Sequence, residues 1–126
     1  MVDFNKVTVI GCGRWGGFLG YYVAKYKKTD VMMYGLEIDP AYQSLIKTGN
    51  NGYVTMPENV SYTTDIEKAL QNQFIIVSIG CQAFRGLCKQ LNQYHLSFLK
   101  LSHHARLCQY KKLAFFEVFQ IINIEF

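Results

Sequence analysis

Strand and helix signals alternate along this chain from Lys6 to Leu91, and this alternation limits the possible folds more than any other feature. A short β-branched run, Val7 to Ile10, stops at a glycine, as a buried parallel strand does. A helical pattern follows, and a second strand is expected at 31–34. Strands separated by helices form a parallel sheet that is covered on both faces, with right-handed crossovers. The sequence therefore predicts an α/β fold with a doubly wound, mostly parallel sheet.

The remaining elements are predicted from caps and apolar runs. The first helix carries large apolar side chains on one face, namely Trp15, Phe18, Leu19, Tyr22, Val23 and Tyr26. Asp39 and Pro40 are typical of the start of a second helix, with Asp39 as its N-cap. Further along the chain we expect a weak strand at 60–63, a short helix at 66–71, a strand at 74–79 and a helix at 82–93.

The alternation decays after about residue 94. A doubly wound sheet needs another buried strand here, and the sequence shows none distinctly, so we expect a sheet that is incomplete at its C-terminal end. The segment is rich in large apolar side chains, including Phe115, Phe116, Phe119, Ile121 and Ile122. Such a patch, if exposed, predicts self-association or docking to a partner. We therefore divide the chain into a domain over 1–93 and an atypical tail over 94–126.

The composition excludes three classes of protein. Half of the 126 residues are hydrophobic and 17% are charged, which excludes a disordered chain. The densest apolar stretch, Phe74 to Cys81, is far shorter than the roughly 20 residues that a membrane span needs. We expect no secretory signal before the first strand, because the uninterrupted apolar run that follows Lys6 is only four residues long. We expect no membrane span and a cytoplasmic location.

The charge and metal-ligand patterns predict no nucleic-acid partner and no metal. The net charge is +4, and from Lys68 onward seven basic residues stand against two acidic ones. These cations are scattered and form no binding signature. The conceivable metal ligands near the tail match no standard zinc spacing; they are His95, His103, His104 and Cys108. The cysteines form no C-x-x-C pair, so we expect thiols that behave as small buried hydrophobes.

A glycine-rich loop with the pattern G-x-G-x-x-G joins the first strand to the first helix, from Gly11 to Gly16. Gly11 permits the sharp turn, Gly13 lets a pyrophosphate approach the backbone, and Gly16 lets the helix pack closely on the sheet. The N–H groups of the first helical turn then hold the phosphates, and Arg14 adds charge at the rim. Because the loop lies between a strand and a helix, it predicts a dinucleotide site rather than a structural turn.

The end of the second strand indicates which dinucleotide is bound. An acid there binds the 2′-hydroxyl of NAD, whereas a basic residue accepts the 2′-phosphate of NADP. Gly35 ends this strand and is followed by Leu36 and Glu37, with no Arg or Lys beside them. The predicted cofactor is therefore NAD or NADP, with NAD favoured. Glu37 is the candidate ribose ligand, and the alternative that it faces solvent stays open.

Several segments, in order, resemble the N-terminal domain of the NAD(P)-dependent glycerol-3-phosphate dehydrogenases. The run from Val7 to Gly16 is similar to the start of that family, in which an aromatic residue precedes the last glycine. The other similar segments are Tyr34-Gly35, Asp39-Pro40, Asn51 with Tyr53, Pro57 to Val60, Thr64 to Leu70, Ile75 to Ile79, and Gln82 to Arg85. The resemblance covers roughly residues 6–92 and implies a Rossmann NAD(P)-binding domain. It also implies cofactor contacts by Arg14, Trp15 and Leu36.

The resemblance implies an oxidoreductase. In this family the domain serves hydride transfer between NAD(P)H and dihydroxyacetone phosphate or sn-glycerol 3-phosphate, so a small phosphorylated substrate is expected for the full-length protein. The family has Pro-Ser where this chain has Gly80-Cys81, and the family's next Lys-Gly element has no counterpart here. Its catalytic lysine lies in a helical substrate domain that is absent here. We therefore assign no catalytic residue and expect a truncated chain that is inactive alone.

Two other interpretations are possible from the residues. The first is the Rossmann domain of a different dehydrogenase or reductase, which Trp15 and the Thr64-Asp65 helix start disfavour. The second is a non-catalytic nucleotide-binding or scaffold module that docks through the apolar tail.

Overall fold

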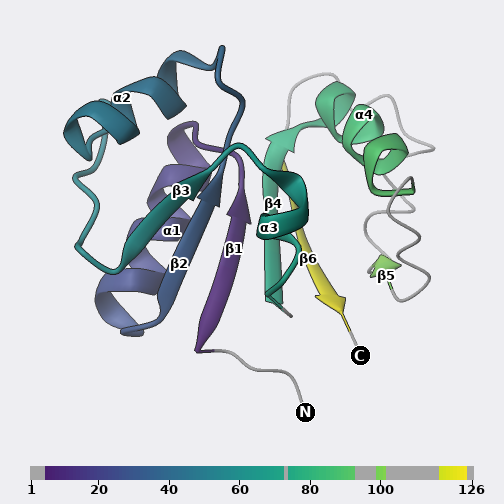
Figure 1. Cartoon of the computed structure of the whole chain (residues 1–126), viewed down its shortest axis with the longest axis horizontal. Coiled ribbons are helices and arrows are strands. Elements are labelled where there is room, and N and C mark those ends of the chain that lie inside the picture. Colours follow the sequence, from purple (N-terminus) through teal and green to yellow (C-terminus); the bar gives the residue numbers. More distant parts are fainter. Residues whose placement is uncertain (1–4, 73, 93–98, 102–116, 125–126) are drawn as a thin grey trace.

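A computed structural model describes residues 5–72, 74–92, 99–101 and 117–124 of the chain (Figure 1). Strands and helices alternate over most of this length. In chain order the elements are β1 (Lys6–Ile10), α1 (Arg14–Tyr26), β2 (Asp30–Tyr34), α2 (Pro40–Thr48), β3 (Val60–Thr63), α3 (Ile66–Ala69), β4 (Phe74–Gly80), α4 (Cys81–Asn92), β5 (Leu99–Leu101) and β6 (Glu117–Ile124).

The strands form one sheet in the order β3-β2-β1-β4-β6-β5. The first four strands of this order are parallel, and Ile10 at the end of β1 pairs with Tyr34 of β2 on one side and Val77 of β4 on the other. Strand β6 runs antiparallel to β4, and β5 runs antiparallel to β6. The predicted α/β, doubly wound, mostly parallel sheet is confirmed.

The tail differs from its sequence interpretation in one respect. No strand was distinct there, yet β6 pairs with β4 along its length, with Ser78 opposite Phe119. The sequence of β6 has neither strict alternation nor a bounded β-branched run, so periodicity alone does not identify it. The side chains of the apolar tail lie outside what the structure describes, and so do His103, His104 and Cys108. The division of the chain at residue 93 and the self-association both stay predictions.

The hydrophobic core lies on both faces of the sheet, because side chains alternate along each strand. Val7 and Val9 of β1 pack on the face that α1 and α2 cover, with Met33 and Leu45. Ile10 packs on the opposite face, beneath α3 and α4, in a cluster with Ile66, Ile75, Val77, Phe84 and Leu87. Figure 1 shows α1 and α3 on opposite sides of the strands.

Helix α1 packs on the sheet through its smallest residues. Its buried positions are Gly16, Gly17, Gly20 and Ala24. A Cβ at Gly20 would lie 2.5 Å from Sδ of Met33 on β2, so a larger residue there would displace the buried Met33 side chain. Leu19 and Val23 pack at the margin of the core. The aromatic residues of the expected apolar face are instead 42% to 60% exposed; they are Trp15, Phe18, Tyr22 and Tyr26.

A buried hydroxyl joins the central strand to α3. Thr8 on β1 is fully buried, and its Oγ1 donates a hydrogen bond to the carbonyl of Ala69 at 2.6 Å. Asn72 Nδ2 donates to the same Oγ1 at 3.0 Å. Both contacts span more than sixty residues of sequence, so Thr8 connects the middle of the sheet to the end of α3.

We expect Thr8→Val to lower the free energy of unfolding by about 1–3 kcal/mol. Valine keeps the shape of the side chain but leaves the Ala69 carbonyl and the Asn72 amide without this partner. Urea unfolding monitored by circular dichroism measures the change. Thr48→Val makes the same chemical change at an exposed hydroxyl and should alter stability by less than about 0.5 kcal/mol. Equal effects of the two substitutions would contradict the assigned role of Thr8.

Candidate functional site

The sheet order creates a crevice where β1 and β4 lie side by side. After β1 the chain builds outward through β2 and β3, and then β4 is added on the other side of β1. Helix α1, which follows β1, covers one face, while α4, which follows β4, covers the other. The connections after these two strands therefore diverge at their carboxyl ends. Ligands of open α/β sheets bind at such a point.

The glycine-rich turn leaves β1 at this crevice, and two of its glycines are required by the backbone. Gly11 has φ +118°, and a Cβ there would lie 2.1 Å from the carbonyl oxygen of Ser78 on β4. A Cβ at Gly16 would lie 2.2 Å from the carbonyl oxygen of Gly11. The Gly11 N–H donates to the Tyr34 carbonyl at 3.0 Å, which attaches the turn to β2. These contacts fix the path of the chain from β1 into α1.

Gly13 differs from its two neighbours, because the fold does not need a glycine there. Its φ of −70° and ψ of −163° are open to any residue, and an added Cβ would meet no atom within 4 Å. Gly13 is the N-cap of α1 and offers no side chain to cap the first helical turn. The first backbone N–H groups of a helix have no intrahelical acceptor. Open space thus adjoins the positive end of the helix.

The polar and aromatic residues predicted beside the glycines surround this helix start. The guanidinium of Arg14 lies over the ring of Tyr53, 5.5 Å from its centre. Trp15 is half exposed and packs edge-on against Phe18, with ring centres 6.4 Å apart. The structure therefore brings Gly11, Gly13, Arg14, Trp15 and Gly16 together at one end of α1.

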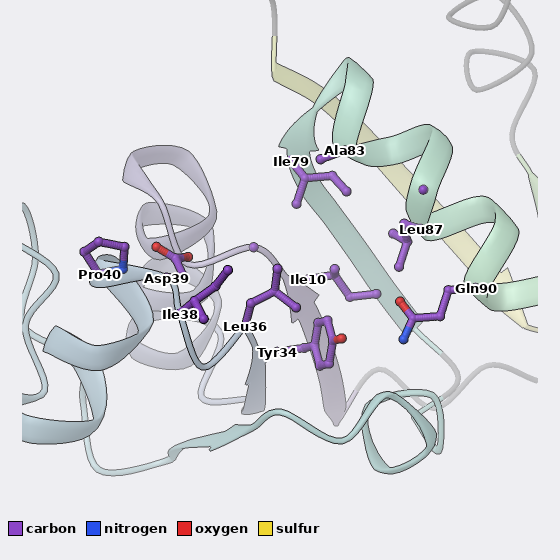
Figure 2. A pocket seen from close by; sticks show the side chains of 13 residues that line it. Ile10, Tyr34, Leu36, Ile38, Asp39, Pro40, Ile79, Ala83, Leu87 and Gln90 are labelled. Carbon is purple, nitrogen blue, oxygen red and sulfur yellow. The ribbon is translucent and has the colours of Figure 1, made fainter.

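A pocket of about 650 Å³ opens beside the turn, between the ends of β1 and β2 and helix α4 (Figure 2). Its lining is mainly apolar and includes Gly11, Leu36, Ile38, Ile79 and Leu87, with Asp39 and Gln90 as polar members. The Asp39 side chain also accepts a hydrogen bond from the Ala41 N–H at 3.0 Å, as the predicted N-cap of α2. Pockets with this balance of apolar wall and few polar groups suit small-molecule ligands.

The structure separates the two residues predicted at the end of β2. Leu36 lines the pocket, whereas Glu37 is exposed and does not belong to the pocket lining. Sequence reasoning missed Ile38, Gln90 and Asn51 as parts of this region. Asn51 lies in the loop between α2 and β3, and its side chain reaches the glycine-rich turn.

Cys12, inside the turn, points into the protein. It is 1% exposed, and its Sγ donates to the Tyr34 carbonyl at 3.5 Å. Burial, reinforced by the nearby Asp39 carboxylate, raises the pKa of the Cys12 thiol to about 12. Cys12 is thus a small buried hydrophobe, as expected, and not a thiolate nucleophile.

The described residues contain no group of three or more His, Cys, Asp or Glu side chains that could hold a metal ion. Among the helices of the same residues, none is both long enough and apolar enough to cross a membrane.

The sheet and its glycine-rich turn define a Rossmann-like nucleotide-binding domain. Residues 6–112 match the family described as NAD-dependent glycerol-3-phosphate dehydrogenase N-terminus, and the chain belongs to this family. The match includes the turn, the pocket and the loop that carries Asn51.

Two curated relatives carry the name of this family. The chain is 32% identical over 103 residues to a glycerol-3-phosphate dehydrogenase [NAD(P)+] of Bacillus pumilus (strain SAFR-032), covering 79% of this chain and 30% of the relative. It is 29% identical to a glycerol-3-phosphate dehydrogenase [NAD(P)+] of Carboxydothermus hydrogenoformans, and this match covers 71% of this chain and 27% of the relative. A solved lactate dehydrogenase from Cryptosporidium parvum is 20% identical with a TM-score of 0.48, covering 76% of this chain and 33% of that chain. The chain therefore spans less than a third of its curated relatives.

We expect stability to fall at alkaline pH because of Cys12. Below pH 9 the thiol is protonated in both states. Between pH 9 and 12 the unfolded chain releases this proton and the native chain keeps it. The free energy of unfolding then falls by up to about 1.4 kcal/mol per pH unit. Denaturant unfolding at pH 8 and pH 10.5 measures the decline, which should be smaller for Cys12→Ala. An equal decline in both proteins would mean that Cys12 does not cause it.

Proposed function

We propose that this chain is the cofactor domain of a glycerol-3-phosphate dehydrogenase and binds NAD or NADP at the turn after β1. The observation that carries the proposal is the open space at Gly13. The fold requires glycine at Gly11 and Gly16, but at Gly13 the backbone is ordinary and nothing occupies the place of a side chain. A glycine that the fold does not need is explained by a ligand that must approach the backbone closely.

The chemistry of the helix start fits a pyrophosphate. The N–H groups of the first turn of α1 and the positive end of its dipole stabilise an anion without any acidic side chain nearby in that turn. Arg14, beside Tyr53, adds a cation at the edge of the same turn. We assign cofactor contacts to Gly11, Gly13, Arg14, Trp15, Gly16, Leu36 and Glu37.

The pocket beside the turn supports NAD over NADP. Its described lining includes Asp39 and contains no Arg or Lys that could pair with a 2′-phosphate. Glu37 lies on the same loop, so two carboxylates stand near the end of β2. Negative charge here disfavours the extra phosphate of NADP.

For the whole enzyme we propose reversible hydride transfer between NAD(P)H and dihydroxyacetone phosphate or sn-glycerol 3-phosphate. The bound nicotinamide supplies the hydride chemistry. The residues of this chain hold and orient the dinucleotide, in a domain assigned to 1–93. None of them is assigned to proton transfer.

We propose that the protein is located in the cytoplasm. We also propose that the tail over 94–126 mediates self-association.

We expect Gly13→Ala to weaken dinucleotide binding strongly while the domain still folds. The added methyl group meets nothing in the protein, so the free energy of unfolding should fall only by about 1 kcal/mol, the usual difference between glycine and alanine at an N-cap. The same methyl group blocks the approach of the pyrophosphate, and the dissociation constant for NADH should rise at least about tenfold. Fluorescence of Trp15 during an NADH titration reports binding. Unchanged affinity in the variant would overturn the proposed site.

We expect Leu36→Arg to shift the preference from NADH toward NADPH, by about tenfold in the ratio of dissociation constants. An arginine at the pocket wall can pair with the 2′-phosphate. Thermal shifts measured in parallel with both dinucleotides give the ratio. Leu36→Met, which changes the shape without adding charge, is the control. If the ratio of the dissociation constants for NADH and NADPH is the same in Leu36→Arg as in the unmodified chain, the ribose does not bind beside Leu36.

A further inference from the structure

We propose that Asn51 is a positioning residue for the dinucleotide: its side-chain amide sets the orientation of the glycine-rich turn without touching the cofactor. The inference rests on the proposed function and adds a residue from outside the turn to it.

The amide of Asn51 bridges two parts of the chain that are far apart in sequence. Its Nδ2 donates to the carbonyl of Gly13 at 3.1 Å and approaches the carbonyl of Cys12 at 3.4 Å. Its Oδ1 accepts from the backbone N–H groups of Tyr53 and Val54, both at 3.1 Å. The oxygen is therefore committed to its own loop, and the amino group is directed at the turn. A flipped amide would lose all of these contacts.

These contacts determine where two N–H groups of the turn point. The Cys12 carbonyl and the Gly13 N–H belong to one peptide unit, and the Gly13 carbonyl and the Arg14 N–H belong to the next. In a planar trans peptide the C=O and N–H point in opposite directions. Asn51 Nδ2 lies against both carbonyls, and the Gly17 N–H also donates to that of Gly13, so the N–H groups of Gly13 and Arg14 are directed away from Asn51. They are the groups that an anion at the helix start needs.

The packing of α1 leaves room for this contact. A Cβ at Gly17 would lie 2.0 Å from Nδ2 of Asn51 and 3.1 Å from its Cγ, so the amide occupies the space where Gly17 has no side chain. The Gly13 carbonyl also accepts the Gly17 N–H at 2.8 Å, the first hydrogen bond of the helix. The same loop provides Tyr53, whose ring lies under Arg14. The loop that carries Asn51 and Tyr53 is thus packed directly against the start of α1.

The neighbouring Asn50 provides a matched control. Its amide also stabilises the loop, since Oδ1 accepts from the Gly52 N–H at 2.6 Å and Nδ2 donates to Thr55 Oγ1 at 2.8 Å. None of its described hydrogen bonds involves the glycine-rich turn. Asn50→Ala therefore removes loop hydrogen bonds of the same kind and leaves the turn intact.

The experiment compares Asn51→Ala, Gly17→Ala and Asn50→Ala in the full chain, with NADH and adenosine as ligands. Adenosine has no phosphate, so its binding does not depend on the orientation of the turn. We expect Asn51→Ala to weaken NADH binding about tenfold and adenosine binding less than twofold. Gly17→Ala displaces the amide while keeping Asn51, and should give the same result. Asn50→Ala should change neither affinity.

A ligand-free measurement separates this inference from the proposed function. NMR order parameters of the Gly13 and Arg14 amides should fall in Asn51→Ala and Gly17→Ala and stay unchanged in Asn50→Ala. If the unmodified chain binds neither NADH nor NADPH, the proposed function is wrong, and the order parameters still decide the role of Asn51. Equal loss of NADH and adenosine binding, unchanged NADH binding, or unchanged order parameters would each overturn the positioning role. Gly17→Ala decides the matter if Asn51→Ala does not fold.

Discussion

The close contact between the backbone after β1 and the strand beside it is the constraint on which the rest of this domain depends. At Gly11 the chain passes so near the Ser78 carbonyl that a single methyl group would collide with it. At Gly16 the first turn of α1 passes equally near the Gly11 carbonyl. Side chains at either point would push the helix off the sheet, and the crevice between the carboxyl ends of β1 and β4 would lose one wall.

The glycines of the turn differ in whether the fold requires them. Gly11 and Gly16 are needed so that the backbone can fold, whereas Gly13 leaves an open space that the protein itself does not fill. Cys12, between them, belongs to the core and keeps its proton, so it contributes packing rather than chemistry. Positions 11, 12, 13 and 16 of the turn thus differ in environment: Gly11 and Gly16 lie against backbone, Cys12 lies in the core, and Gly13 adjoins open space. A short segment can therefore pack tightly against a buried sheet and still leave the start of the helix accessible.

Much of the fold could be predicted because its signals are local. β1 and β4 are short β-branched runs, and Asp39 caps α2 as its sequence context predicts. The exposure of the aromatic residues of α1 was not predicted. The face of α1 that packs on the sheet is the one that carries Gly16, Gly17 and Gly20. A pattern of large apolar residues does not identify this face, because glycine is not counted in it. β6 lacked a periodic pattern. Asn51 could not be predicted as a partner of Gly13, because no local rule links residues 38 positions apart.

The glycine content of α1 also has a consequence for how the domain folds. Gly16 lies in the first turn of the helix and Gly17 and Gly20 lie further in, and a glycine in a helix interior lowers helix propensity by about 1 kcal/mol relative to alanine. A peptide of this sequence would be largely coil in water, since thirteen residues are marginal even for good helix formers. α1 therefore depends on its packing against the sheet to remain helical. The open helix start at Gly13 thus depends on the tertiary packing of the domain.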